Sequence, residues 1–376
     1  MTSGTTASGT TTPGLFDPIT LRSLTVPHRG WVAAMCQYSC DPVGAPGVPT
    51  DWHLVHLGQF ATGGAAMIIT EAAAVSPEGR ISPRDAGIYN AEQVAAWRRI
   101  TDFIHTQGTP GTLTGIQLAH AGRKASTYWP FSRLHGSVPE AEGGWETLGP
   151  TGEAFDGYAA PRAMTEEDIL AVIRDFGEGA RRAVEAGFDT VEIHGAHGYL
   201  LHQFLTPLVN TRTDGWGGSE EARFRLTLEV IDEVRRNIPA EMPLLLRISA
   251  SDWVEGGLDG AASARLAAKA AEHGVDFVDV SSGGAVAHVR IPVGPGYQVE
   301  FAETVRAAGL PTGAVGLIDD PEQAEGIIRE GKADVVLIAR AALRDPHWWL
   351  RAAHVLKREL APVPQYQRAG SFGRTR

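Results

Sequence analysis

The stretch that decides the fold is Glu185-Ala186-Gly187-Phe188-Asp189-Thr190-Val191-Glu192-Ile193. It has the form of a helix end, a glycine, an aspartate and a short apolar strand. The same form recurs as EHGVDFVDV at 272–280 and as EGKADVVLI at 330–338. The glycine suits the left-handed residue that ends a helix, and the apolar run is typical of a parallel strand covered on both faces. The repeat therefore predicts units of one strand and one helix.

Eight such units span most of the chain. Eight strands that alternate with helical patterns favour a single-domain (β/α)8 TIM barrel over a doubly wound sheet. No GxGxxG sequence follows any strand, which argues against a Rossmann dinucleotide domain. The predicted strands are Trp31–Ala34, Met67–Thr70, Leu113–Leu118, Thr190–His194, Leu244–Ile248, Phe277–Ser281, Thr312–Val315 and Val335–Ala339.

The helix before the fourth strand has the clearest pattern. Thr165 and Asp168 have the spacing of a capping box, which predicts the helix start. An apolar face at helical spacing follows, made of Ile169, Ile173, Phe176, Ala180 and Val184.

A long capping loop follows the third predicted strand. It runs over residues 125–163 and carries the aromatic residues Tyr128, Trp129, Phe131 and Trp145. Long loops in compact domains are usually functional or disordered, and the aromatic side chains favour a lid over the barrel. Packing against the outside of the barrel is the alternative.

Composition and charge limit the classes of function. Hydrophobic residues make up 43% and charged residues 20% of the 376, as in soluble globular enzymes. The net charge of −11 argues against nucleic-acid or anionic-membrane binding, and no apolar run reaches the length of a membrane span. Residues 1–14 are rich in Ser, Thr and Gly, lack the features of a signal peptide, and are expected to form a disordered tail. The barrel is expected over 15–363 and a C-terminal tail over 364–376.

The chain has two cysteines, Cys36 and Cys40. Two thiols cannot build a disulfide framework or supply the four ligands of an iron–sulfur cluster, so a cytoplasmic location is expected. A redox pair of the two is one hypothesis. We favour separate roles, with Cys40 as a buried, inert thiol.

Polar and glycine-rich residues gather just after the predicted strands, where barrels carry their functional groups. Glycine-rich turns at 281–284 and 313–316, together with Arg340, predict a phosphate site, because free backbone N–H groups and a guanidinium can meet an anion there. The other residues at strand ends are Met35, Cys36, Gln37, Tyr38, Glu71, Ala72, Gln117, His120, Arg123, His194, His197, Tyr199 and Arg247.

The run His194-Gly195-Ala196-His197-Gly198-Tyr199 carries the chemistry at the fourth strand. Two imidazoles and a phenol suit a carbonyl compound that becomes an enolate, which needs oxyanion stabilisation and a proton. A satisfied histidine pair is the plain structural alternative. Zinc binding is disfavoured, because zinc needs three or four protein ligands and no third one is placed beside the histidines. No metal is expected.

The predicted phosphate site and two polar side chains together suit flavin mononucleotide (FMN). Gln117 is placed to hydrogen-bond the pyrimidine edge of the flavin ring. Arg247 is placed to stabilise negative charge near N1 and O2 of the reduced flavin. An ion pair inside the barrel is the alternative role of Arg247.

Three motifs together resemble one family. They are QLAHAGRK at 117–124, HGAHGY at 194–199 and NTRTDGWGGS at 210–219. With them, the sequence from Leu15 to about Arg368 resembles the Old Yellow Enzyme family of FMN-dependent ene-reductases. MCQYS at 35–39 is similar to the thermophilic-like (bacterial) subgroup, in which a cysteine and a tyrosine replace residues of the yeast-type enzymes.

The resemblance implies a role for each matched residue. His194 and His197 bind the oxygen of the activating carbonyl, while Tyr199 gives a proton to the α-carbon and flavin N5 gives a hydride to the β-carbon. Tyr38 adds a hydrogen bond to the substrate, and Cys36 lies against the flavin and tunes its redox behaviour. The residues expected to hold FMN are Ala33, Ala34, Met35, Cys36, Ala72, Gln117, Arg247, Gly283, Gly284, Gly316, Ala339 and Arg340.

The implied activity is reduction of C=C bonds activated by a carbonyl or nitro group, in enones, enals, maleimides and nitroalkenes. The cofactor is non-covalent FMN, and the reductant is NADPH or NADH. Without a separate nicotinamide domain, NAD(P)H must use the substrate cavity, which predicts ping-pong kinetics. A flavin-dependent oxidase of 2-hydroxy acids is the alternative enzyme, and a barrel that only binds a ligand is the third hypothesis.

Three positions depart from the family pattern. Ala34 stands where the family usually has proline, which is expected to loosen the backbone beneath the flavin. Ala339 stands where glycine usually precedes the arginine, which is expected to shift the phosphate contact. The segment PQYQR at 364–368 resembles a tail whose arginine reaches a neighbour's active site, so Arg368 is expected to bind substrate across a homodimer or homotetramer. Here the chain continues to Arg376 without the usual aromatic ending, and a solvated arginine is the alternative.

Overall fold

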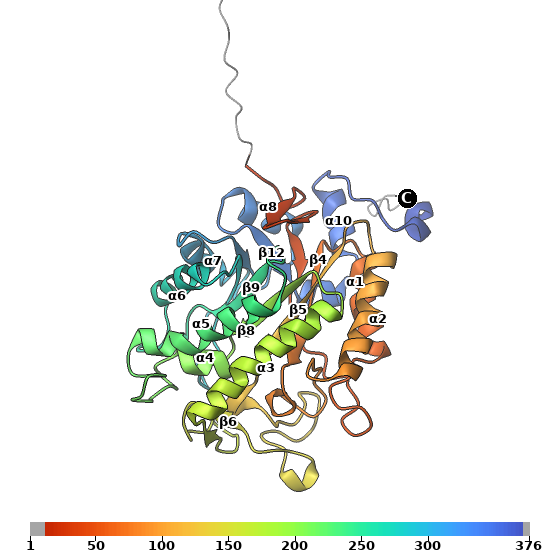
Figure 1. Cartoon of the computed structure of the whole chain (residues 1–376). Coiled ribbons are helices and arrows are strands. Elements are labelled where there is room, and N and C mark those ends of the chain that lie inside the picture. Colours follow the sequence, from red (N-terminus) through yellow and green to blue (C-terminus); the bar gives the residue numbers. More distant parts are fainter. Residues whose placement is uncertain (1–11, 371–376) are drawn as a thin grey trace, which may run out of the picture.

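The computed structural model describes residues 12–370, and its centre is a closed barrel of parallel strands (Figure 1). Around the barrel the strands follow the order β3-β4-β5-β8-β9-β10-β11-β12. This confirms the predicted (β/α)8 fold, and each predicted strand is present with small shifts at its ends. The strands are Gly30–Val32 (β3), Met67–Ala74 (β4), Leu113–Ala119 (β5), Thr190–Gly195 (β8), Leu244–Ser249 (β9), Phe277–Ser281 (β10), Thr312–Ala314 (β11) and Val335–Ile338 (β12).

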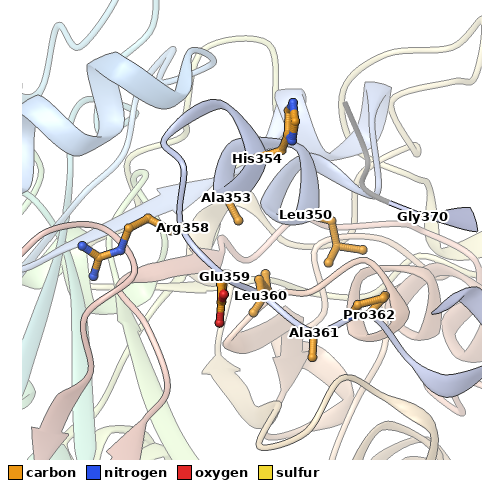
Figure 2. A pocket seen from close by; sticks show the side chains of 9 residues that line it. All are labelled: Leu350, Ala353, His354, Arg358, Glu359, Leu360, Ala361, Pro362 and Gly370. Atoms are coloured by element: carbon orange, nitrogen blue, oxygen red, sulfur yellow. The ribbon is translucent and has the colours of Figure 1, made fainter. Parts of the chain in front are cut away.

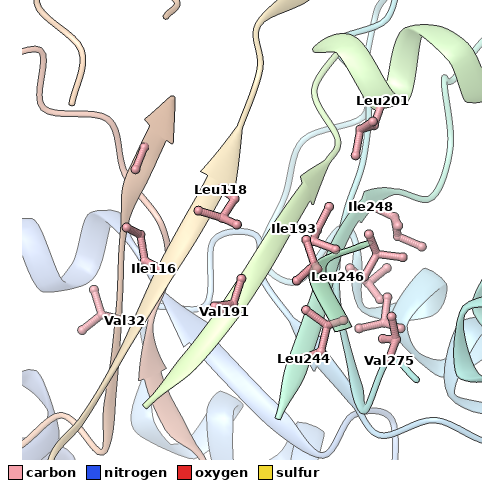
Figure 3. Packing of buried hydrophobic residues seen from close by; sticks show 14 of the residues in the cluster. Val32, Ile116, Leu118, Val191, Ile193, Leu201, Leu244, Leu246, Ile248 and Val275 are labelled. Carbon is pink, nitrogen blue, oxygen red and sulfur yellow. The ribbon is translucent and has the colours of Figure 1, made fainter. Parts of the chain in front are cut away.

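Helices surround this barrel and bury the outer faces of its strands. Figure 3 shows this layer, where Ile116 and Leu118 of β5 lie beside Val191 and Ile193 of β8. The helices are Asp51–Thr62 (α1), Ala91–Gln107 (α2), Glu166–Glu185 (α3), Leu200–Leu205 (α4), Glu220–Asn237 (α5), Gly260–Glu272 (α6), Val299–Arg306 (α7), Pro321–Arg329 (α8), Arg340–Arg344 (α9) and Trp348–Val355 (α10). Short 3-10 turns lie at Pro77–Gly79 (η1), Gly122–Lys124 (η2), Glu140–Glu142 (η3) and Pro364–Ala369 (η4).

Helix α3 begins as predicted. The Thr165 side chain accepts from the Asp168 N–H and the Asp168 carboxylate accepts from the Thr165 N–H, which completes a capping box. Four of the five residues of the predicted apolar face are buried, while Val184 is half-buried.

The inside of the barrel has an apolar floor below a polar layer. The hairpin of Ile19–Leu21 (β1) and Leu24–Val26 (β2) belongs to the same apolar cluster as the floor. Because alternate residues of a strand face the same side, Arg247 follows Leu245 and Asp279 follows Phe277 toward the carboxyl ends of the strands. The polar layer thus lies directly above the floor. The floor residues are Trp31, Met67, Ile69, Leu245, Phe277, Val335 and Leu337.

Residues 1–11 and 371–376 lie outside the described residues. They include most of the predicted N-terminal tail and the last part of the predicted C-terminal tail. The tail predicted over 1–14 extends too far. Gly14 is buried, and its N–H donates to the Asp17 carboxylate at 2.7 Å. Ordered structure therefore begins before the predicted boundary. Within the described residues, no helix combines the length and the apolar character needed to cross a membrane.

The capping loop contains η3 and a two-stranded sheet of Leu148–Gly149 (β6) and Arg162–Ala163 (β7). The indole N–H of Trp145 donates to the backbone oxygen of Glu78, just beyond β4, at 2.9 Å. The ring of Phe131 packs edge-on against Tyr38, with 6.3 Å between centroids. These contacts place the loop at the carboxyl ends of the strands.

Removing apolar volume from the barrel floor should cost stability. Leu245 is fully buried, so Leu245→Ala leaves a cavity and should lower the free energy of unfolding by about 2–5 kcal/mol. Leu170 on α3 is 40% exposed, and Leu170→Ala should change it by only about 0.5 kcal/mol. Urea unfolding of both variants tests this expectation. Equal losses would contradict the assignment of Leu245 to the core.

Candidate active site

The carboxyl end of β8 brings His194, His197 and Tyr199 together. The His194 ring lies 5.2 Å from the His197 ring and 5.2 Å from the Tyr199 ring, measured between centroids. Gly198 makes this close turn possible. It has a φ of +72°, and a Cβ there would lie 1.9 Å from the backbone oxygen of Gly284. The predicted trio is therefore a real cluster, held against the turn after β10.

The two imidazoles have different hydrogen bonds. The His197 ring nitrogen Nε2 lies 2.8 Å from Ser281 Oγ. The backbone N–H of His197 donates to Ser249 Oγ at 2.9 Å. His194 Nδ1 is buried and has no hydrogen-bond partner among residues 12–370. Buried polar atoms are rarely left unpaired, so this nitrogen marks a place where a bound molecule would add a partner.

Burial sets the protonation states of the trio. Burial and the nearby Arg247 cation lower the pKa of both His194 and His197 well below the usual 6.5. Burial raises the pKa of Tyr199 well above 10. At neutral pH the site therefore holds two uncharged imidazoles and a protonated phenol.

Lys124 is a site residue that the sequence analysis quoted in a motif but gave no role. Its ammonium donates to the backbone oxygens of His197 at 2.8 Å and Gly284 at 3.1 Å. The same ammonium lies 5.2 Å from the centre of the Tyr199 ring. Burial lowers the pKa of Lys124 to about 8. The Lys124 side chain thus connects the turn after β8 to the turn after β10, next to the Tyr199 phenol.

A buried pair made of His202 on α4 and Asp252, just after β9, supports the same turn. The Gly198 N–H donates to His202 Nδ1 at 2.8 Å, so the other ring nitrogen carries the proton. That nitrogen, Nε2, lies 3.0 Å from the Asp252 carboxylate, and both side chains are fully buried. This pair was not predicted from the sequence, because its contacts join α4 to the segment after β9.

A second pair of this kind supports the loop after β3, which carries Cys36 and Tyr38. The Thr50 N–H donates to His53 Nδ1 at 2.9 Å, and His53 Nε2 lies 3.0 Å from Glu71. The other Glu71 oxygen accepts from the Gln37 N–H at 3.0 Å. Glu71 was predicted from the sequence to lie at a strand end, but no role was predicted for it. Its carboxylate positions the loop through the Gln37 backbone.

Cys36 and Tyr38 pack with Tyr199 on one small apolar cluster, so the loop faces the β8 trio. Both cysteines are free, and burial raises the pKa of both thiols. Cys40 is buried with its sulfur 4.0 Å from His53 Nε2, which suits the separate role predicted for it.

A cavity of about 540 Å³ lies at the carboxyl ends of β3 and β12. Four of the residues predicted to hold FMN line it: Met35, Cys36, Ala339 and Arg340. Arg340 is exposed and makes no ion pair within the described part of the chain. A phosphate group would provide that partner.

The glycine turns after β10 and β11 form a backbone cradle. Gly283, Gly284 and Gly316 have φ values of +74°, +96° and +122°. A Cβ on Gly284 would lie 2.6 Å from the His197 backbone. In residues 12–370 the N–H groups of Gly284 and Gly316 donate to no acceptor. Free N–H groups beside a free guanidinium fit the phosphate end of FMN.

Gln117 and Arg247 lie in the polar layer inside the barrel. Arg247 Nε forms an ion pair with Asp279 at 3.0 Å, and its Nη1 donates to the backbone oxygen of Ala34 at 3.3 Å. Gln117 donates to Glu192 at 2.7 Å. The sequence analysis missed both carboxylates, although acidic residues within otherwise apolar buried strands were a signal for them.

Two of the three departures from the family pattern lie at the strand ends. The hydrogen bond from Arg247 holds the backbone at Ala34, where the family usually has proline. Ala339 has a φ of −110°, so this position does not need the left-handed conformation that favours glycine.

Arg368 does not join the site within one chain. The C-terminal segment lies at the opposite end of the barrel from the capping loop (Figure 1). Leu350 and Leu360 pack against Gly64, just before β4 begins, and the Tyr366 ring lies 5.7 Å from that of His347. Figure 2 shows a cavity of about 350 Å³ between α10 and this segment, which is no part of the site at the strand ends.

The closed barrel, the glycine turns with free N–H groups and the buried imidazoles and phenol are features of a cofactor-dependent barrel enzyme. The chain belongs to the NADH:flavin oxidoreductase / NADH oxidase family, whose sequence model matches residues 14–359. This confirms the resemblance to Old Yellow Enzyme. The protein is an oxidoreductase that uses FMN with NAD(P)H as reductant.

Individual relatives agree over nearly the whole chain. An NADPH dehydrogenase of Geobacillus sp. (strain WCH70) is 44% identical over 360 residues, covering 95% of this chain and 99% of its own. That of Bacillus subtilis (strain 168) is 43% identical, covering 94% and 98%. Among solved structures, morphinone reductase matches with a TM-score of 0.75 and 27% identity, covering 94% and 92%. The Old Yellow Enzyme homologue from Zymomonas mobilis matches with 0.74 and 27%, covering 93% and 94%.

The glycine cradle yields a prediction about FMN retention. In Gly284→Ala the new Cβ would meet the His197 backbone at 2.6 Å, so the turn must shift and the purified protein should lose most of its FMN. Gly309→Ala is the matched control, because Gly309 also has a positive φ, +104°, but nothing lies within 4 Å of its Cβ position. The flavin absorbance per protein chain measures the effect. Equal FMN content in both variants would contradict the cradle.

Proposed function

We propose that this oxidoreductase reduces C=C bonds conjugated to a carbonyl or nitro group. The observation that carries the proposal is the buried cluster at β8, where two uncharged imidazoles lie beside a protonated phenol. Relatives named NADPH dehydrogenase favour reduction driven by a nicotinamide over oxidation of 2-hydroxy acids. Enones, enals, maleimides and nitroalkenes are the proposed substrate class.

FMN, when bound, supplies the hydride. Gln117 and Arg247 would hold its polar edge, and Gly283, Gly284, Gly316 and Arg340 its phosphate end. Ala33, Ala34, Met35, Cys36, Ala72 and Ala339 would line the rest of its site. The fit rests on the free N–H groups of the glycine cradle and on the unpaired Arg340.

His194 and His197 hold and polarise the oxygen of the activating group. Uncharged N–H donors stabilise the negative charge that develops on this oxygen without first giving up a proton. Tyr199 donates its phenolic proton to the α-carbon, and Tyr38 adds a hydrogen bond to the substrate. The capping loop over residues 125–163 acts as a lid that excludes water. NAD(P)H and the alkene use the same cavity in turn, which gives ping-pong kinetics.

Removing the phenolic proton should separate the two halves of the reaction. Tyr199→Phe should slow alkene reduction by about 10²–10⁴-fold and leave flavin reduction by NADPH nearly unchanged. Tyr89→Phe is the control, because the Tyr89 hydroxyl donates to the Pro46 backbone and belongs to no part of the site. Stopped-flow absorbance follows each half-reaction. Equal slowing of both by Tyr199→Phe would exclude a proton-donor role.

The lowered histidine pKa values predict the pH profile of alkene reduction. Both folded-state values lie well below 6.5, so both imidazoles stay uncharged as the pH crosses 6.5. The rate of the alkene step should therefore show no break there. Stopped-flow measurement of this step across that pH range is the test. A break near 6.5 would show that one of the histidines titrates normally.

We also propose that the protein is a homodimer or homotetramer in which Arg368 reaches a neighbour's substrate site. The C-terminal segment lies at the opposite end of the barrel from the active site of the same chain, and this position supports the arrangement.

Mixing variants tests the shared site. Tyr199→Phe and Arg368→Ala chains should each be impaired, and dissociating and reassembling the two together should restore part of the alkene reduction, because some sites then hold both native residues. In the control, Tyr199→Phe is mixed with the double variant, which cannot rebuild a site. Failure of the first mixture to exceed the control would contradict a role in trans.

A further inference from the structure

Two carboxyl groups and one guanidinium share the polar layer inside the barrel. Glu192 on β8 and Asp279 on β10 are fully buried, and Arg247 on β9 is 6% exposed. Strand register pairs Arg247 with His194 on one side and with Asp279 on the other. Glu192 lies two residues before His194 on β8, so its side chain also faces the barrel interior, nearer the apolar floor than His194. The three groups lie directly beneath the site.

The partners of the two carboxyl groups are unequal. Asp279 Oδ2 lies 3.0 Å from Arg247 Nε in an ion pair, although neither Asp279 oxygen has a hydrogen bond within the described residues. Glu192 Oε1 accepts from the Gln117 amide at 2.7 Å, while its Oε2 is buried with no hydrogen-bond partner among the described residues. Glu192 thus contacts a neutral donor, and Asp279 contacts the cation.

The charges in this layer do not balance if both carboxyl groups ionise. Glu192 faces Gln117 from β5, Arg247 from β9 and Asp279 from β10, and the only cation among these is Arg247. His194, above it on β8, is uncharged. Two carboxylates would leave one negative charge without a partner in a buried interior, which is strongly unfavourable.

We propose that Glu192 and Asp279 share one proton, that Glu192 carries it, and that this proton keeps the barrel interior electrically neutral beneath the flavin. Asp279 is the ionised member because it contacts the guanidinium. The unpartnered Glu192 Oε2 is the atom that holds the proton. Buried carboxyl groups that interact electrostatically ionise one at a time.

The proton has a consequence for the cofactor, and this step rests on the proposed contact of Arg247 with the polar edge of FMN. Negative charge that develops at this edge on reduction is stabilised by Arg247. An ionised Glu192 would oppose that stabilisation. Burial and the neighbouring Asp279 raise the pKa of Glu192 to about 8, so the proton stays in place at neutral pH and leaves only in alkaline solution.

The test compares two Glu→Gln variants of the FMN-loaded enzyme. Glu192→Gln replaces a neutral acid by a neutral amide of similar shape. Glu167→Gln removes a carboxyl group from an exposed site on α3 and serves as the control. Infrared spectroscopy should show a carbonyl stretch of a protonated carboxylic acid in the wild type and in the control that is lost in Glu192→Gln. Any band of Asp85, whose pKa burial raises to about 7, is present in all three proteins.

The FMN reduction potential gives a second readout. At neutral pH it should be the same in all three proteins, and above pH 8 it should fall more steeply in the wild type and the control than in Glu192→Gln. A potential that rises at neutral pH in Glu192→Gln would overturn the proposal, because it would show that a carboxylate charge had been removed. Persistence of the acid band in that variant would also overturn it.

A further variant tests the sharing itself. Asp279→Asn leaves one carboxyl group for one guanidinium, so Glu192 should ionise and the acid band should vanish. A retained band would overturn the shared proton. Labelling the wild type with ¹³C-glutamate assigns the band without any substitution, because the Glu192 band then shifts and an aspartic acid band such as that of Asp85 does not. Absence of any shifted band contradicts the proposal. None of these readouts uses an alkene, so a failure of the proposed alkene reduction is seen separately.

Discussion

The buried guanidinium of Arg247 is the interaction on which the electrostatics of the site depend. It forms an ion pair with Asp279 and donates to the backbone oxygen of Ala34, just after β3. It also helps to keep His194 and His197 uncharged. A single buried cation acts over several ångströms, because the effective dielectric constant inside a protein is lower than that of water. The uncharged state of the two histidines beside the phenol therefore depends on the barrel interior as well as on the histidines themselves.

The two loops that carry the reactive side chains are held by the same device. Behind the β8 turn, His202 joins the Gly198 N–H to Asp252, and behind the β3 loop, His53 joins the Thr50 N–H to Glu71. In each pair one ring nitrogen accepts from the backbone, which leaves the other to face a carboxylate. The arrangement fixes the tautomer and the ring direction, so it orients a loop more firmly than apolar packing would.

Much of the fold and part of the site followed from local patterns. The repeated helix end, glycine and apolar run predicted three of the barrel strands, and the alternation of short apolar strands with helical patterns predicted the others. The position just after each strand predicted where the polar residues gather. The groups that were missed make their contacts across strands or helices. Glu71 is the clearest case, because the register between β4 and β5 shifts between Ile69 and Ala72. Simple alternation from Ile69 would place Glu71 inside the barrel, yet its carboxylate contacts His53 on α1.

The sequence alone determined the eightfold strand repeat, the apolar character of the strands and the residue types at their ends, since these depend on short-range spacing and on the need to bury apolar surface. The tertiary structure decided which side chains meet inside the barrel and which stay uncharged there. Closure brings Gln117, Glu192, Arg247 and Asp279 from four strands into one buried layer. Their ionisation depends on how many charges share that layer, a quantity that no single stretch of sequence contains.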